Sequence, residues 1–265
     1  MLVFRKWFLA LALVMLTVAV ASAQPALQCI ANAGVPPLVR AEGIAELTGD
    51  LVLNCNNGIP TAVGGSVPQV NVQIFLNTNV TSRLVGDNDS EALLMIDEPV
   101  PAEQQVCASG GSTGTSCQTP ITVNSVTPLP SNPGLVYKPH TVVSGETTTN
   151  YRPYNVWQGR KGAENSIYWL GIPMDAPGTT FTRIVRITNV RANANQLGVS
   201  STLVPNQIIA YISITGSTSV PINNPQQTVA WIQQGLDFSV RQLDDDSGSV
   251  SLAQCADSAK DLFTD

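Results

Sequence analysis

Carboxylate side chains are the first residues of this sequence that could carry chemistry. A glycoside hydrolase needs two of them, one protonated as the acid and one ionised, about 5 to 9.5 Å apart. Asp97 and Glu98 are neighbours, but adjacent side chains of a strand point to opposite faces of a sheet. The sequence does not select a pair from the candidates, which are Glu42, Glu46, Asp50, Asp97, Glu98, Glu164 and Asp175. A glycoside hydrolase with an unlocated acid pair therefore ranks third among the hypotheses of function.

A serine pattern typical of hydrolases occurs once, at residues 110–114, which read Gly-Gly-Ser-Thr-Gly. This G-x-S-x-G pattern needs a strand before the serine and a helix after it. Here it lies in a Gly/Ser-rich stretch between Cys107 and Cys117. The sole histidine, His140, follows a proline and is expected in a solvated loop. We therefore assign no catalytic residue.

An alternation of acidic residues at Asp87, Asp89 and Glu91 suggests a calcium site, because Ca²⁺ prefers oxygen ligands. Glu98 stands at the twelfth position of this run, as in an EF-hand loop, but Ala92 occupies the sixth, where that loop needs glycine. A looser site made of the first three residues is the one cofactor hypothesis. The alternative is a polar hairpin turn.

An aromatic segment between residues 151 and 169 is the clearest candidate for ligand binding. Exposed aromatic rings with polar neighbours suit stacking on sugar rings. The alternative is core packing, because Tyr168 and Trp169 point to opposite faces of a strand and one of them must face inward. The candidate ligand-binding residues are Tyr151, Tyr154, Trp157, Tyr168 and Trp169.

Three arginines, Arg183, Arg186 and Arg191, follow this segment on one predicted strand. We expect them to pair with the abundant carboxylates rather than to bind an anionic ligand.

The elements that must position these residues are strands. Apolar side chains alternate with polar ones from Val70 to Thr81 and again from Gln207 to Thr215, where only Ile209 and Tyr211 interrupt the polar face. Further strands are predicted at Leu47–Cys55, Glu91–Glu98, Asn165–Ile172, Phe181–Arg191, Gln227–Trp231 and Leu236–Arg241. We expect an all-β fold, an antiparallel β-sandwich of immunoglobulin-like or jelly-roll-like kind with long loops and disulfides.

Two long polar stretches, Pro99–Thr119 and Thr127–Asn150, are predicted to be loops. We expect one domain over residues 24–242, with an internal boundary near 120–150 as the alternative. Residues 243–265 are expected to form an acidic tail or the start of a further segment.

The first 23 residues have the pattern of a secretory signal peptide. Arg5 and Lys6 precede the apolar stretch Trp7–Val20, and small residues at 21–23 form a cleavage site. We expect a secreted or cell-surface protein, with the periplasm as an alternative, and no membrane span after cleavage.

Five cysteines remain after such cleavage, and exported thiols usually pair. Pairing of nearest neighbours joins Cys29 to Cys55 and Cys107 to Cys117, although spacing leaves other connectivities open. Cys255 is then left over, and we expect the natural chain to continue and supply its partner.

Composition excludes two classes of function. Thirteen Lys and Arg against nineteen Asp and Glu leave too few cations for a nucleic-acid surface, and one histidine cannot build a His-rich zinc site. The expected partners are other surface proteins or glycans.

Four segments resemble parts of uncharacterised secreted, β-rich proteins of environmental bacteria: residues 46–55, 70–83, 91–99 and 186–193. This resemblance implies export and a β-rich surface protein, and it brings no activity or catalytic residue.

The leading hypothesis is a non-enzymatic extracellular β-sandwich module for structure, adhesion or assembly. A carbohydrate-binding module that uses the 151–169 aromatic residues is the second hypothesis. For assembly, the long strand Val70–Thr81 is expected to offer an exposed edge to another chain.

Overall fold

The computed structural model describes residues 25–62, 64–107, 136–144, 147–200, 204–217 and 220–235. Within these ranges the chain forms strands and the short 3-10 turns η2 (Pro101–Glu103) and η5 (Ala194–Gln196), with no α-helix. The predicted mostly-β class is therefore confirmed for the described residues.

One large sheet holds most of the strands. Neighbours in this sheet follow the order β15 (Ile222–Asn223), β1 (Gln28–Ala33), β4 (Leu51–Asn57), β12 (Gly178–Thr188), β6 (Asp89–Ile96), β10 (Val156–Lys161), β11 (Ser166–Pro173), β5 (Gln69–Leu76), β14 (Asn206–Gly216), β16 (Gln226–Gln233) and β2 (Leu38–Arg40), with β7 (Val106–Cys107) beside β10. Small separate sheets pair β3 (Glu46–Leu47) with β13 (Arg191–Ala192), and β8 (His140–Ser144) with β9 (Thr147–Tyr151).

The sheet is mixed and curled, and the predicted antiparallel sandwich is not confirmed. Most neighbours are antiparallel, but β1 and β15, β2 and β16, and β7 and β10 pair in parallel. Period-two alternation shows which face of a strand is buried and carries no information on the direction of its partner, so these parallel pairs left no sequence signal.

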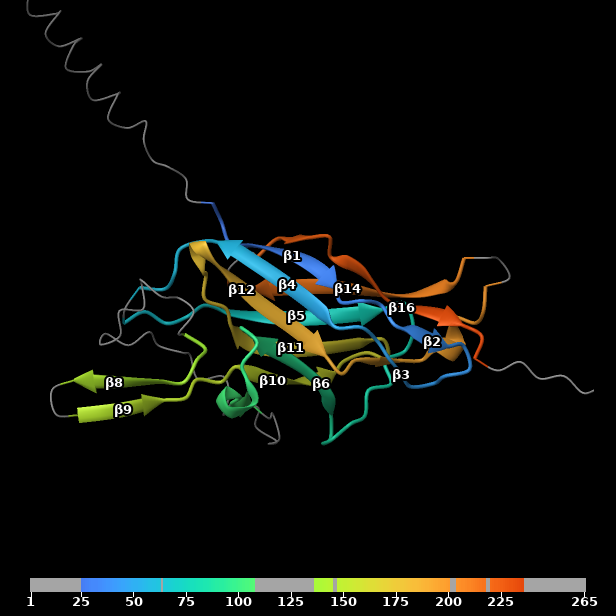
Figure 1. Cartoon of the computed structure of the whole chain (residues 1–265), viewed down its shortest axis with the longest axis horizontal. Helices are drawn as coiled ribbons and strands as arrows, with labels where there is room; N and C mark the ends of the chain where they lie inside the picture. The colour runs from blue at the N-terminus through green and yellow to red at the C-terminus, as the bar shows by residue number, and fades with distance from the viewer. Residues whose placement is uncertain are drawn as a thin grey trace, which may run out of the picture.

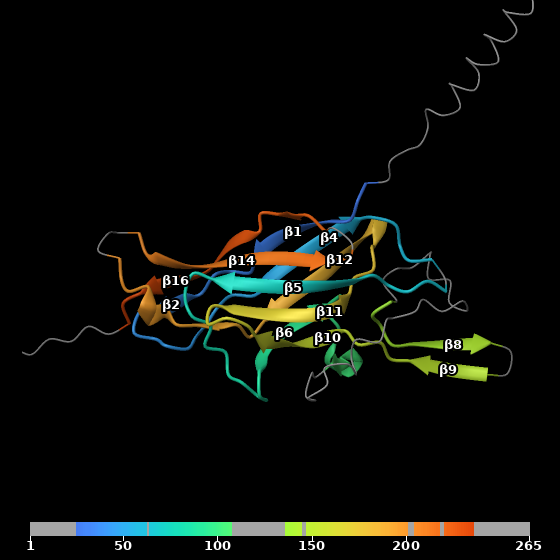
Figure 2. The same cartoon turned by 180° about the vertical axis from the view of Figure 1, so that it is seen from behind.

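A side chain of β16 links the two ends of the sheet. The Gln227 amide on β16 donates from Nε2 to the Ala31 oxygen (3.0 Å) and accepts from the Ala33 nitrogen (3.2 Å) on β1. Figure 1 shows β4 and β12 in front, whereas the view from behind in Figure 2 brings β5, β11 and β14 forward. The sheet thus folds over one interior, which its inward side chains fill.

The interior side chains come from alternate positions of the strands. On β5 the buried residues are Val70, Val72, Ile74 and Leu76, as the alternation predicts. This strand lies between β11 and β14, so its edges are paired and the expected assembly through an exposed Val70–Thr81 edge is wrong. The strand also ends at Leu76, short of the predicted Thr81.

The disulfide between Cys29 and Cys55 is confirmed, and it joins paired residues of β1 and β4 inside the core. Cys107 is also disulfide-bonded. Its predicted partner Cys117 lies outside the described residues, as do Cys255, the Gly110–Gly114 pattern, the predicted signal peptide, the predicted Leu236–Arg241 strand and the acidic tail.

The second predicted loop is partly wrong, because residues 140–144 and 147–151 form the paired antiparallel strands β8 and β9. The first contains η2 and β7 in its described part. In the sheet, two strands that precede both stretches, β4 and β6, alternate with two strands that follow them, β12 and β10. Their order is β4, β12, β6, β10.

Candidate functional site

A buried cluster of charged side chains is built around Arg183. This residue shares the inward face of β12 with Val185 and Ile187 and is only 1% exposed. Its guanidinium forms an ion pair with Asp97, and its Nη2 lies 3.8 Å from Oδ2 of Asp175. The fold thus brings together two of the seven candidate acids, although they are 78 positions apart in the chain (175 − 97).

Local backbone geometry places Asp97 for this contact. Asp97 follows the last residue of β6 with a φ of 57°, in the left-handed region that aspartate tolerates better than most residues. Its backbone nitrogen donates to the Ile184 oxygen (2.8 Å), while its Oδ1 accepts from the Ile184 nitrogen (3.2 Å). The side chain is therefore turned back onto β12.

Tyr137 and Thr61 complete the cluster. The Tyr137 ring stacks on Arg183 with 4.6 Å between the guanidinium carbon and the ring centroid. Its hydroxyl donates to the Pro173 oxygen and accepts from the Asp175 nitrogen, each at 2.8 Å. Asp175 Oδ1 accepts from both the backbone nitrogen (2.8 Å) and the hydroxyl (2.7 Å) of Thr61. Both acids are therefore fixed by hydrogen bonds as well as by the arginine.

Burial shifts the titration of this cluster. Desolvation raises the pKa of the Asp97 carboxyl above its ordinary value of 3.8, against the lowering effects of Arg183 and the Ile184 amide. Desolvation also raises the pKa of the Tyr137 phenol well above its usual range. The tyrosine stays neutral and serves the cluster as a hydrogen-bonding group and a cover.

The other two arginines of this segment also pair with carboxylates, as predicted. Arg186 faces outward from β12 and bridges Glu98 and Asp50, the latter at 3.0 Å. Arg191 contacts Glu91 at 2.9 Å.

All seven candidate acids have a partner. Three of them have not yet been described. Glu46 pairs with Arg40 at 2.8 Å, and Glu164 accepts from Asn79 at 3.4 Å. Glu42 accepts from the Gly235 nitrogen at 3.1 Å. Of these three contacts, the Glu46–Arg40 pair joins two strands, β3 and β2, and the other two join connecting segments.

The predicted calcium ligands are not gathered into one site. Asp89 is buried and lies 3.5 Å from Arg160, whereas Glu91 contacts Arg191 and Asp87 is exposed. The described residues contain no group of three or more His, Cys, Asp or Glu side chains placed to hold a metal ion. Asp89 and Glu91 share one face of β6, but each pairs with a different arginine.

The predicted aromatic platform is not formed by its tryptophans. Trp157 is 4% exposed and Trp169 is 1% exposed, and the Trp169 indole donates to the Trp157 oxygen at 3.2 Å. Tyr154 packs against the core, and the Tyr151 side chain lies outside the described residues. Tyr168 is half-buried, on the strand face opposite Trp169. Core packing, the alternative reading, therefore explains both tryptophans.

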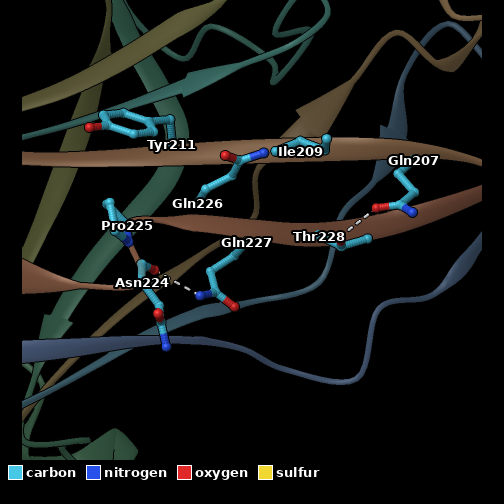
Figure 3. A pocket seen from close by; sticks show the side chains of 8 residues that line it. All are labelled: Gln207, Ile209, Tyr211, Asn224, Pro225, Gln226, Gln227 and Thr228. Atoms are coloured by element: carbon cyan, nitrogen blue, oxygen red, sulfur yellow. Dashed lines mark hydrogen bonds between the residues drawn. The ribbon is translucent and has the colours of Figure 1, made fainter.

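A shallow groove that the sequence did not point to lies on the outer face of β14 and β16. It has a volume of about 490 Å³ and is lined by Gln207, Ile209, Tyr211, Asn224, Pro225, Gln226, Gln227 and Thr228 (Figure 3). Two of these residues, Ile209 and Tyr211, are those that interrupt the polar face of the predicted strand. An exposed aromatic residue on an otherwise polar face was the signal for this surface.

Comparisons with known proteins give no identity for the chain. It matches no protein-family model, no curated protein and no solved structure. Among the described residues, none of the helical segments has the length and apolar character needed to cross a membrane.

Proposed function

We propose that this chain is a non-enzymatic module of the cell surface or extracellular matrix that serves structure, adhesion or assembly. The observation that carries the proposal is the closed ion-pair cluster of Asp97, Arg183 and Asp175. A glycosidase needs one of its two acids protonated and both facing the substrate. In this cluster both acids face a buried arginine, so their role is to link β12 to the segments that follow β6 and β11.

Export is supported by two observations of different kinds. The first residues have the pattern of a secretory signal peptide, and the core contains the Cys29–Cys55 disulfide. Disulfides of this kind form and persist in oxidising compartments.

In this proposal, other molecules bind to the outer faces of the sheet. The central position of β5 removes strand addition at Val70–Thr81 as the means of assembly. Carbohydrate binding is a second candidate function, favoured by one observation: the β14–β16 groove carries an exposed tyrosine among uncharged polar side chains.

A bead assay tests the adhesive role. Beads coated with the purified full chain are expected to be retained on bacterial cell layers or on polysaccharide matrix better than beads coated with an unrelated acidic protein. Retention equal to that of the control beads would contradict adhesion.

A hydrolysis assay tests the non-enzymatic part of the proposal. The chain is incubated with chromogenic glycosides beside its Asp175→Asn variant. We expect no turnover by either protein. Turnover that is lost in Asp175→Asn would overturn the proposal, because it would make the buried acid a catalytic residue.

A further inference from the structure

The β14–β16 groove offers one aromatic ring to the outside of the molecule. Tyr211 is 50% exposed and lies on the outward face of β14, directly opposite Gln226 of β16 and Phe75 of β5. Its neighbours Ala210 and Ile212 point inward and are buried. The core is thus filled without Tyr211, whose ring is left free to contact a ligand.

The groove also offers hydrogen-bonding groups that have no partner within the described part of the chain. The side-chain amides of Gln226 and Asn224 and the Tyr211 hydroxyl make no hydrogen bond there. Each amide carries both a donor group and an acceptor oxygen. Figure 3 shows Tyr211 and Gln226 on adjacent strands of the groove.

The framework that holds these groups is fixed by bonds of its own. Gln227 Nε2 donates to the Asn224 oxygen (2.8 Å), and the Ile212 nitrogen donates to the Pro225 oxygen (2.9 Å). Thr228 Oγ1 donates to Gln207 Oε1 at 2.7 Å across the two strands. The turn before β16 and the wall of the groove are therefore held in place before any ligand arrives, which reduces the entropy lost on binding.

The chemistry of the lining selects the class of ligand. All eight lining residues are uncharged, so an anionic or cationic ligand would lose its hydration without gaining a countercharge. Neutral sugars carry hydroxyls that both donate and accept, which matches the amides, and their C–H faces stack on aromatic rings. A peptide or lipid would instead call for an apolar groove, and Ile209 and Pro225 are the only purely apolar side chains among these eight.

We propose that the β14–β16 groove binds a neutral oligosaccharide, with Tyr211 stacking on one sugar ring and the amides of Gln226 and Asn224 bonding to its hydroxyls. This inference rests on the proposed adhesive function and gives it a ligand class. It moves the sugar-binding surface from the 151–169 segment, whose tryptophans are in the core, to β14 and β16, which lie beyond β5 in the sheet order.

Affinity electrophoresis of the full chain tests the groove. The purified protein is run in native gels that contain a soluble glucan, galactomannan or xylan, with polygalacturonate as the anionic contrast. We expect retardation by at least one neutral polysaccharide and none by polygalacturonate. Tyr211→Ala should weaken the retardation about tenfold, and Tyr211→Phe should keep most of it because the ring remains.

Phe181→Ala provides the matched control. Phe181 is an aromatic residue of β12 that is 41% exposed, away from the groove. Its loss should leave retardation unchanged, and the unfolding midpoints of all variants report whether each is folded.

The groove proposal is overturned if no neutral polysaccharide retards the unaltered chain, or if Tyr211→Ala is retarded as strongly as the parent. The bead assay is scored separately, so adhesion without retardation would overturn the groove alone. Bead retention no better than that of the control beads, together with retardation by a neutral polysaccharide, would overturn adhesion while supporting the groove.

Discussion

Arg183 forms ion pairs with two of the candidate acids and so gives both of them a structural role. An arginine on the inward face of a strand is costly to bury unless its charge is paired and its donors are bound. Asp97, Asp175 and the Tyr137 ring meet that requirement from three different segments. The acids are consequently part of the packing of the molecule.

Removing this arginine should be severely destabilising. Arg183→Met leaves the buried Asp175 and the partly buried Asp97 without their cation, and we expect a loss of about 3 to 5 kcal/mol in the free energy of unfolding. Urea unfolding measures the loss. Arg186→Met is the matched control, because Arg186 is on the outward face of the same strand and its pairs should contribute about 1 kcal/mol or less. Similar losses in the two variants would show that burial does not set the strength of the Arg183 cluster.

The Asp97 carboxyl should make stability depend on pH. Its pKa in the folded protein is raised above 3.8, so the folded state binds this proton more tightly than the unfolded chain does. The resulting stabilisation is fully present below pH 3.8 and is lost as the pH rises through the raised pKa. The unfolding free energy of the parent, minus that of Asp97→Asn, should therefore fall with rising pH across this window. Urea titrations at a series of pH values measure it, and a difference that grows with pH would contradict the assignment.

At the scale of elements, β1 and β16 are joined by a side chain where other neighbours use a backbone ladder. The Gln227 side chain accepts from the Ala33 nitrogen at 3.2 Å and donates to the Ala31 oxygen at 3.0 Å. These two bonds replace those that the backbone of a paired strand would make. Together with the short parallel pairs of β15 and β2, this amide closes the seam of the curled sheet.

Gln227→Ala should open this seam. Two bonds to part-buried backbone groups of β1 are lost, which should cost about 1 to 3 kcal/mol in unfolding free energy. The Ala33 amide should also exchange its hydrogen faster with solvent, which NMR can follow. Gln226 precedes Gln227 in β16 and is exposed, so Gln226→Ala should change the free energy of unfolding by about 0.5 kcal/mol or less. Unchanged exchange at Ala33 would show that the seam does not depend on Gln227.

Strands with weak alternation were those missed from the sequence. β1 buries only Cys29 and Ala31, whose side chains are small, and β10 carries Gly159 at a shift of register. A Cβ on Gly159 would lie 2.7 Å from Ile167 and 2.9 Å from Trp169, so glycine lets Trp169 pack directly over the backbone. Such close approach is decided by the neighbouring strand, which a single segment of sequence does not contain.

At the scale of the whole molecule, the sheet joins early and late parts of the chain. β4 and β6 both take β12 as a neighbour, and β5 lies between β11 and β14. The strands β4, β5 and β6 precede the predicted loops in the chain, and each pairs with at least one strand that follows those loops.

A fragment of residues 24–125 should therefore fail to fold alone. It would keep β1 beside β4 but would leave β5 and β6 without any of their neighbours in the sheet. We expect a broad, non-cooperative urea transition by near-ultraviolet circular dichroism, where the full chain gives a sigmoidal one. A sigmoidal transition of the fragment would instead support an internal domain boundary near residues 120–150.

The amino-acid sequence by itself determined the strand-rich class, the inward residues of β5 and β14 and the pairing of the three arginines with acids, and it favoured the Cys29–Cys55 bridge over other pairings. These features follow from local alternation, short spacing and charge, all of which a single segment carries. Only the tertiary structure decided that β5 is central, that Asp97 and Asp175 meet at Arg183, that the tryptophans are buried and that Tyr211 is left outside. Those outcomes depend on which distant strands become neighbours, and alternation is the same whichever partner a strand takes.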